Sequence, residues 1–442
     1  QAQKFACCPF HFESALESLA TAMLHSNAAE AVAPTERKSF AFVFPMASGH
    51  INPSLPIARS LVNLGHEVHY LCRAPMRAAI EDTGSSFHSD VGWETELYDG
   101  REPDIFGAMQ CLSAEYGLEG GSLYLVLFKL MAVTMELKLP GLLRFLRKVA
   151  PSAVVFCPLQ SVEAALAARV FHIPSVAIIT TAGLGSTTQF VGDMLQQDGL
   201  SERQVERELH SYEPHLAAVA RLNAQYGLGL GPLSLARIGP MGRLGALAYA
   251  SATLVTTTED LQDPLTPELE ATYAAQGVAT TCVGPLLDRE GALRASVHKY
   301  EGEAGKPRAS ADAAARQAED LLARARAARA AGRPVVIVSM GTVITGDHRS
   351  LGWAGRMPGP DGRPRGLTGR QLCQAAWGGV FDALGAEAPE EGALVLVALG
   401  LQQDALGELL APPNALCAPT IPQLDLLKAG VDLFLTHGGQ NS

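Results

Sequence analysis

One stretch decides the fold: Phe40-Ala-Phe-Val-Phe-Pro-Met-Ala-Ser-Gly-His-Ile-Asn-Pro-Ser-Leu-Pro-Ile-Ala-Arg-Ser-Leu-Val-Asn-Leu-Gly-His-Glu-Val-His-Tyr-Leu-Cys72. It opens with an apolar run, which predicts a buried strand. A loop with two prolines follows, and Ser54 is the expected N-cap of a helix. Apolar residues then recur at helical spacing as far as Gly65, and a second strand starts at Val68. This strand–helix–strand unit predicts a parallel sheet covered by helices.

His50 lies in the loop after the first predicted strand. Ligands of open parallel sheets collect at the carboxyl ends of the strands, and a histidine there is suited to act as a base. An equally weighted alternative is a loop histidine that only satisfies a backbone carbonyl. The loop has one glycine, Gly49, and lacks the G-x-G-x-x-G fingerprint, which argues against a nicotinamide or flavin dehydrogenase.

The composition is that of a globular chain with a large core. Of its 442 residues, 48% are hydrophobic and 18% are charged, and the net charge of −11 disfavours nucleic acid and acidic membrane surfaces as partners. Eight scattered cysteines without metal-ligand spacing predict no structural metal and a reducing compartment. No apolar run reaches the roughly 18 residues of a membrane span. We therefore expect a cytoplasmic protein.

Strand-like and helix-like segments alternate in two blocks, which predicts an α/β protein with two doubly wound Rossmann-like domains facing each other across a cleft. The repeat is one of architecture, without a sequence period. The expected divisions are an N-terminal extension (1–36), a first domain (37–265), a linker with an exposed Ala/Arg-rich helix (266–332) and a second domain (333–442).

The end of the chain carries the sharper of the two candidate sites. The segment His437-Gly-Gly-Gln-Asn-Ser442 follows a predicted buried strand and should open a helix. Free backbone N–H groups at a helix start bind phosphate oxygens, and adjacent glycines allow close approach. An ordinary tight turn is the alternative interpretation. Gly341-Thr342, after another predicted strand, could face the same phosphates.

Four motifs of the chain belong together: Gly-His-Ile-Asn-Pro at 49–53, Val-Gly-Pro-Leu at 283–286, Val-Ser-Met-Gly-Thr at 338–342, and Pro-Gln-Leu-Asp-Leu-Leu with Thr-His-Gly-Gly-Gln-Asn-Ser within 422–442. With these motifs the chain resembles the UDP-glycosyltransferases, most of all the bacterial macrolide and plant natural-product branch. The resemblance runs from about residue 38 to the end, and its last motif is the specific one.

The resemblance implies the GT-B fold, with an acceptor-binding first domain and a nucleotide-sugar-binding second domain. It implies inverting transfer of a sugar from a UDP-sugar to a small hydrophobic hydroxylated acceptor, with His50 as general base. No metal and no cofactor besides the UDP-sugar co-substrate is implied. The implied donor-binding residues are Thr342, Gln423, His437, Gly438, Gly439, Asn441 and Ser442, of which Gln423 would lie near the uracil or ribose.

Three departures from the family pattern stand out. The aspartate that orients the catalytic histidine is replaced by Cys157, and Glu163 is a hypothetical substitute for it. The tryptophan that stacks on the base is replaced by Thr420. The chain stops inside the donor motif, at Ser442, so we expect a fragment with an incomplete second domain. Cys157 and the missing end of the donor motif favour an alternative, a catalytically inactive glycosyltransferase-like binding or scaffold protein, whereas His50 and the phosphate loop oppose it.

Overall fold

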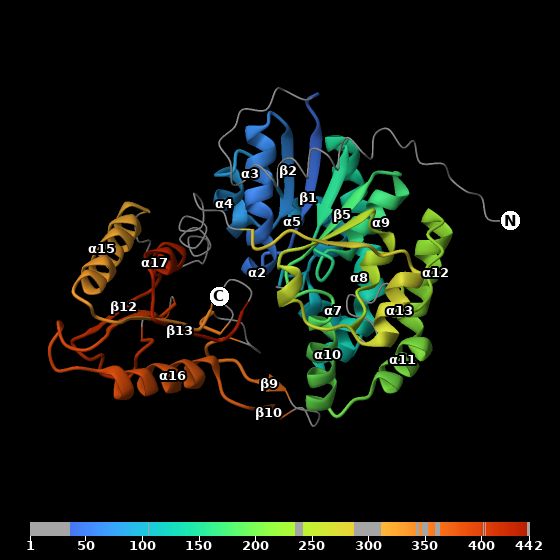
Figure 1. The fold of residues 1–442 in the computed structure, drawn as a ribbon. Helices are drawn as coiled ribbons and strands as arrows, with labels where there is room; N and C mark the ends of the chain where they lie inside the picture. Colours follow the sequence, from blue (N-terminus) through green and yellow to red (C-terminus); the bar gives the residue numbers. More distant parts are fainter. Residues whose placement is uncertain are drawn as a thin grey trace. The chain divides into compact units, whose positions relative to one another are not determined.

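The computed structural model of the protein describes residues 36–104, 106–234, 242–286, 311–341, 344–346, 352–358, 363–400, 402 and 404–439. The chain divides into two compact units, residues 1–288 and 289–442. Each unit is built around its own parallel sheet with helices beside it (Figure 1).

Unit 1 contains a seven-stranded sheet with the strand order β3-β2-β1-β4-β5-β6-β7. Every neighbouring pair is parallel, and β1 is paired with β2 on one side and with β4, the middle strand of the sheet, on the other. This order is that of a Rossmann-like doubly wound sheet, as predicted. The strands are β1 (Ser39–Val43), β2 (Glu67–Cys72), β3 (Ser86–Ser89), β4 (Ala153–Phe156), β5 (Ser175–Ile179), β6 (Ala252–Val255) and β7 (Thr280–Cys282).

Helices connect these strands and bury the sheet. The central strands β1, β4 and β5 are almost wholly buried, because apolar side chains on both of their faces meet helices. The helices of unit 1 are α2 (Ser48–Ile51), α3 (Leu55–Asn63), α4 (Arg77–Glu81), α5 (Asp90–Trp93), α6 (Thr95–Tyr98), α7 (Met109–Glu115), α8 (Leu123–Val149), α9 (Val162–Val170), α10 (Ser186–Gln197), α11 (Glu202–Ser211), α12 (Glu213–Tyr226) and α13 (Pro267–Ala275).

The turn from β1 into α3 differs in detail from the prediction. The expected loop contains the short helix α2 and a 3₁₀ turn, and Ser54 stands at the N-cap of α3 without capping it. The Ser54 hydroxyl instead lies 2.7 Å from the carbonyl oxygen of Ile51, to which it donates, and 2.8 Å from the Tyr70 hydroxyl of β2. Gly65 has a φ of 88°, which confirms the expected left-handed residue after α3.

Unit 2 repeats the same topology over the strands that the structure describes. Its four-stranded parallel sheet has the order β12-β11-β8-β13, so its first strand again lies between its second and its fourth. The elements are β8 (Val335–Ser339), β11 (Leu394–Ala398), β12 (Ala415–Ala418), β13 (Leu433–Thr436), a hairpin of β9 (Met357–Pro358) and β10 (Pro364–Arg365), and the helices α15 (Ala311–Ala330), α16 (Gly369–Leu384) and α17 (Gln423–Ala429).

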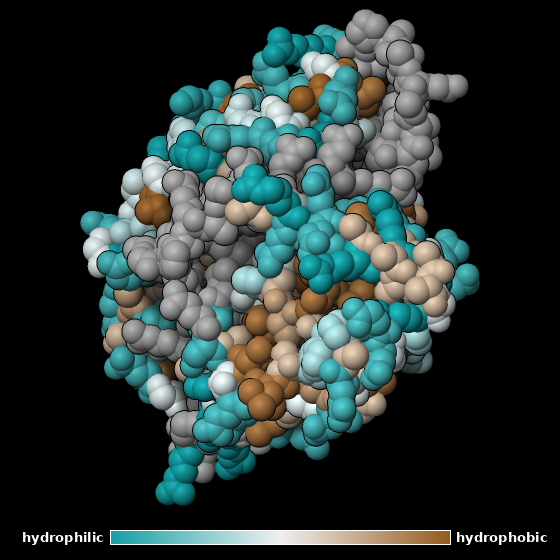
Figure 2. Space-filling model, turned by 90° about the vertical axis from the view of Figure 1, so that its left-hand side faces the viewer, coloured by the Kyte–Doolittle hydropathy of each residue, from teal (hydrophilic) through white to brown (hydrophobic). Residues whose placement is uncertain are grey.

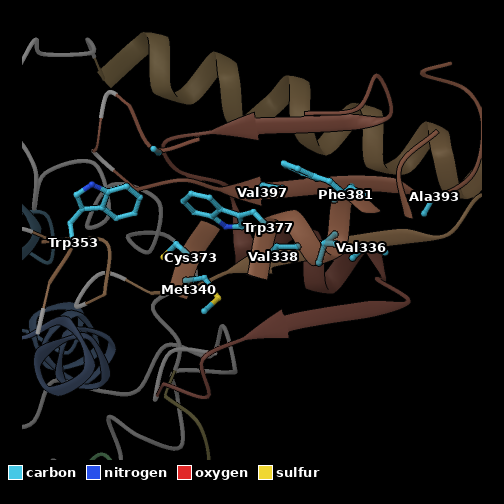
Figure 3. Packing of buried hydrophobic residues seen from close by; sticks show 12 residues of the cluster. Val336, Val338, Met340, Trp353, Cys373, Trp377, Phe381, Ala393 and Val397 are labelled. Atoms are coloured by element: carbon cyan, nitrogen blue, oxygen red, sulfur yellow. The ribbon is translucent and has the colours of Figure 1, made fainter. Parts of the chain in front are cut away.

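Two hydrophobic clusters hold unit 2 together, one on each face of its sheet. Trp353 and Trp377 lie next to each other in the cluster on one face (Figure 3), and their rings are tilted by 33° with the centres 6.1 Å apart. The other cluster includes Leu321, Ala325 and Ala328 of α15. Their burial places α15 in the core of unit 2, although the sequence predicts an exposed helix in a linker. The unit boundary at residue 288 lies inside the expected linker of 266–332, because β7 completes the sheet of unit 1 and α15 packs in unit 2.

Some apolar side chains remain at the surface. Figure 2 shows an area where they gather within a mostly hydrophilic face. Among the large apolar side chains that the structure describes, Leu410 is the most exposed, at 91%. Isolated exposed leucines are ordinary in folded proteins. In the described part of the chain, no helix has both the length and the apolar character to cross a membrane.

Candidate active site

His50 lies at the carboxyl edge of the unit 1 sheet, where β1 ends and α2 begins. Its backbone N–H donates to the Ala47 carbonyl oxygen over 2.9 Å, which holds the first turn after the strand. Its Nδ1 lies 3.3 Å from Sγ of Cys157 and 3.5 Å from Oγ1 of Thr180. Cys157 directly follows β4 and Thr180 directly follows β5. Three neighbouring strands therefore bring these side chains to one point.

This point is the topological switch of the sheet. The chain builds the sheet outward from β1 to β3 on one side, and then outward from β4 to β7 on the other side, so the direction changes between β1 and β4. Position 157, where the family that the sequence resembles has an aspartate, thus touches the histidine and presents a thiol. Thr180 is a neighbour that the sequence analysis missed. The rule that polar residues at strand ends mark sites could have found it, because Thr180 follows the buried strand Ser175–Ile179.

Burial lowers the pKa of His50 to about 4, so the imidazole is neutral at pH 7. In a neutral imidazole one nitrogen carries the hydrogen and the other accepts. For Nε2 to accept a proton from a substrate, Nδ1 must carry the hydrogen and donate to Cys157 or Thr180. Neither group has the negative charge with which a carboxylate would stabilise the imidazolium. The site therefore has a base in the correct ionisation state but with low basicity.

Glu163 lies in a different environment from the one hypothesised. It is the second residue of α9 and is only 1% exposed. Its Oε1 forms an ion pair with Lys138 of α8, which is also 3.8 Å from Oε1 of Glu94. Nδ1 of His50 contacts Cys157 and Thr180, whereas Glu163 contacts Lys138. The structure therefore shows no contact between Glu163 and His50 among the described residues. A role for Glu163 in orienting His50 stays a prediction that its contacts do not favour.

In unit 2, the residues that follow β8 and β13 lie side by side. A Cβ atom placed on Gly341 would be 2.2 Å from Cε1 of His437, and one placed on Gly439 would be 2.4 Å from its Nε2. The imidazole of His437 therefore rests against the bare backbone of both glycines. Gly341 and Gly438 also have φ angles of 77° and 74°, which other residues rarely adopt. Glycine is therefore required at 341 by both the close approach and the backbone angle, at 438 by the backbone angle, and at 439 by the close approach.

Of the other residues predicted to bind the donor, one lies at the same edge of the sheet as His437, and the rest lie outside the described residues. Gln423 begins α17, after β12, which is the edge strand opposite β13. It lies on the same carboxyl edge of the sheet as Gly341 and His437. Thr342, Asn441 and Ser442 lie outside the described residues. Within the described part of the chain, no group of three or more His, Cys, Asp or Glu side chains is arranged to hold a metal ion.

The two units show a correspondence at their switch points. In each sheet the first and fourth strands in chain order are neighbours, and a candidate residue follows each of them. His50 and Cys157 follow β1 and β4 in unit 1, and Gly341 and His437 follow β8 and β13 in unit 2. Open doubly wound sheets bind ligands at this place. Each unit therefore offers one candidate substrate site.

The two Rossmann-like sheets, together with the solved structures that resemble the chain, confirm the expected GT-B type of architecture, with one doubly wound sheet in each unit. No protein-family model and no curated protein matches the chain. Among solved structures, the glycotransferase of kitacinnamycin is similar, with 20% identity, a TM-score of 0.50, and coverage of 92% of this chain and 77% of that one. The calicheamicin glycosyltransferase CalG4 is similar at 17% identity and a TM-score of 0.51, with 92% and 76% covered. At these identities the likeness establishes the fold alone.

Proposed function

We propose that the protein is an inverting glycosyltransferase that moves a sugar from a UDP-sugar to a hydroxyl group of a small hydrophobic acceptor. The observation that carries the proposal is the pair of switch-point sites on a glycosyltransferase fold. One presents a neutral histidine, and the other presents glycine backbone around His437. Each edge would hold one substrate, the acceptor hydroxyl at His50 and the diphosphate at 437–439.

The reaction would proceed as a single displacement. Nε2 of His50 takes the hydroxyl proton while the acceptor oxygen attacks the anomeric carbon. The bond from that carbon to the diphosphate oxygen breaks, and UDP leaves with the electron pair. The backbone N–H of Gly439 and the side chain of His437 would stabilise the charge that develops on the diphosphate. The backbone N–H of Gly438 already donates to Oγ1 of Thr436 over 3.3 Å, so Gly438 would serve through its missing side chain rather than as a donor. Thr342, Gln423, Asn441 and Ser442 are assigned to the donor on the motif resemblance only.

A second candidate function is that of a catalytically inactive binding or scaffold protein with the same fold. The contact between Nδ1 of His50 and the thiol of Cys157, at 3.3 Å, favours it, because an uncharged partner leaves His50 a weak base. This candidate predicts UDP binding without turnover.

The two candidates are separated by measuring UDP release from UDP-glucose in the presence of a panel of phenolic and polyketide acceptors. Sugar transfer requires acceptor-dependent UDP release that is abolished by His50→Ala, with UDP binding retained in that variant. UDP binding by calorimetry without release for any acceptor or sugar donor would favour the inactive candidate. Transfer at an unchanged rate in His50→Ala would refute the assignment of the base.

A further inference from the structure

Unit 1 contains a charged cavity that the proposed proton transfer does not use. Its volume is about 40 Å³, and it lies at the carboxyl ends of β1, β2 and β4. Strand-end and loop residues from Val43 to Met46 form one side of it, and Gln160 and Ser161 form another. Its charged lining consists of Arg73, Asp90, Glu94, Asp104, Lys138 and Glu163.

Two carboxylates in this lining are only half satisfied. Glu94 is 2% exposed and Glu163 is 1% exposed, and each turns its Oε1 towards Nζ of Lys138. The Oε2 atoms of both are buried and have no hydrogen-bond partner among the described residues. A buried carboxylate oxygen without a donor costs about 1–3 kcal/mol or more, so such atoms are rare in folded proteins. Both orphan atoms belong to residues that line the same cavity, which points to a missing hydrogen-bond donor there.

The other charged groups of the lining are already paired. The Arg73 guanidinium donates to both carboxylate oxygens of Asp90 over 3.0 and 2.9 Å, and to the Tyr98 hydroxyl over 2.6 Å. The Asp104 carboxylate accepts from two backbone N–H groups, each over 2.8 Å. What remains is the single ammonium of Lys138 between Glu94 and Glu163. With both glutamates ionised, the inner part of the cavity would therefore be short of one positive charge.

The ionisation of Glu94 agrees with this deficit. Burial raises its pKa to about 8 against the opposing effect of Lys138, and the neighbouring Glu163 and Asp90 raise it further. A carboxyl group with an adequate cationic partner would have its pKa lowered instead. A second cation in the cavity would restore the ionised form of Glu94.

The cavity and His50 share the same two loops. The loop after β1 lines the cavity with Pro45 and Met46 and then carries His50 at its far end. The loop after β4 starts at Cys157, which touches His50, and lines the cavity with Gln160 and Ser161. The backbone N–H of Ser161 donates to the Cys157 carbonyl oxygen over 2.9 Å, which ties the two places together. A ligand that reaches into the cavity would therefore lie beside the candidate base.

We propose that this cavity receives a primary ammonium group of the acceptor, which donates hydrogen bonds to Oε2 of Glu94 and Oε2 of Glu163. An ammonium group is about the size of a water molecule, and a cavity of about 40 Å³ is large enough for it. With a pKa near 10, a primary amine is charged at pH 7 and supplies the missing positive charge. That the bound amine is a sugar acceptor rests on the proposed function. If it is, the acceptors of this protein are amines that also carry a hydroxyl group.

The test is calorimetric binding of tyramine and of N-acetyltyramine to the chain at pH 7, without any sugar donor. Both probes carry the same phenol, but only tyramine has an ammonium group. We expect tyramine to bind at least tenfold more tightly, and we expect Glu94→Gln and Glu163→Gln to remove that preference. The matched control is Glu136→Gln, which changes a partly exposed carboxylate that is paired with Arg221 and does not line the cavity.

Glu163→Gln leaves Lys138 with a weaker partner, so its folding is checked by circular dichroism. Glu94→Gln keeps the shape of a side chain that is largely uncharged at pH 7, and this variant decides the result if Glu163→Gln unfolds. Equal affinity for the two probes, or a preference unchanged in Glu94→Gln, would show that the cavity holds only water. Tyramine binding without sugar transfer to it from any donor would refute the proposed function and leave the amine site standing.

Discussion

Cys157→Asp would place a carboxylate against Nδ1 of His50, where the protein has a thiol at 3.3 Å. At an effective dielectric constant of about 20, two unit charges about 4 Å apart attract by about 4 kcal/mol. Since one pKa unit corresponds to about 1.4 kcal/mol, the full attraction would raise the histidine pKa by about 3 units. Partial desolvation of the new aspartate reduces this, so we expect a rise of about 2 units.

The pKa of His50 would then move from about 4 to about 6, nearer to the value that suits a general base at neutral pH. We expect kcat/KM for sugar transfer at pH 7.5 to increase by about tenfold, because the imidazole becomes a better proton acceptor while remaining mostly neutral. The pH dependence should change in the same direction. Transfer by the wild type should be lost as the pH falls through about 4, and transfer by Cys157→Asp should be lost about 2 units higher.

The assay has two readouts. The His50 Hε1 proton is titrated by NMR, and acceptor-dependent UDP release is followed across pH. Cys157→Asn is the control, since it has the shape of aspartate without the charge and should leave both the pKa and the rate low. The reasoning fails if Cys157→Asp leaves the pKa of His50 below 5, or if the pKa rises while the rate stays at that of Cys157→Asn.

Three further predictions concern the candidate base, the candidate donor loop and the charged cavity. His50→Ala should abolish sugar transfer and leave UDP affinity within about twofold, because the base lies in unit 1; a calorimetric loss of UDP binding would contradict this. Gly439→Ala should weaken UDP binding by about tenfold, since its Cβ would collide with the His437 imidazole, whereas Gly379→Ala, which meets no neighbour, should not; equal affinities would argue against a diphosphate site at His437. For Glu94, the pKa is raised above its unfolded value of 4.5, so its contribution to stability is present below that pH and is lost as pH rises through about 8. Urea unfolding at pH 6 and 8.5 should therefore show a smaller loss of stability in Glu94→Gln than in the wild type, and identical losses would contradict the raised pKa.

Local pattern was enough to predict most of the architecture. The apolar runs that became β1, β4, β8 and β13 are short, continuous and bounded by loop residues, and each is a strand in the structure. Residues that follow such strands are expected at the carboxyl edge of a sheet, because parallel strands present their carboxyl ends on one side, and the structure places them at that edge. His50 and the glycines 341, 438 and 439 could be chosen in this way without coordinates. The predicted linker was less accurate, because the propensity of Ala311–Ala330 for helix does not reveal that one side of α15 is buried.

The chemistry of the site depends on contacts between distant parts of the chain. Cys157 and Thr180 lie 107 and 130 residues from His50, and only the strand order β1-β4-β5 brings them to its Nδ1. Lys138 reaches Glu163 because α8 packs beside α9, and this pairing separates Glu163 from the role hypothesised for it. Periodicity and spacing describe what each segment is, since they depend on neighbours along the chain. Which side chains meet, and hence how basic a histidine is or which carboxylate lacks a partner, is decided by packing between segments.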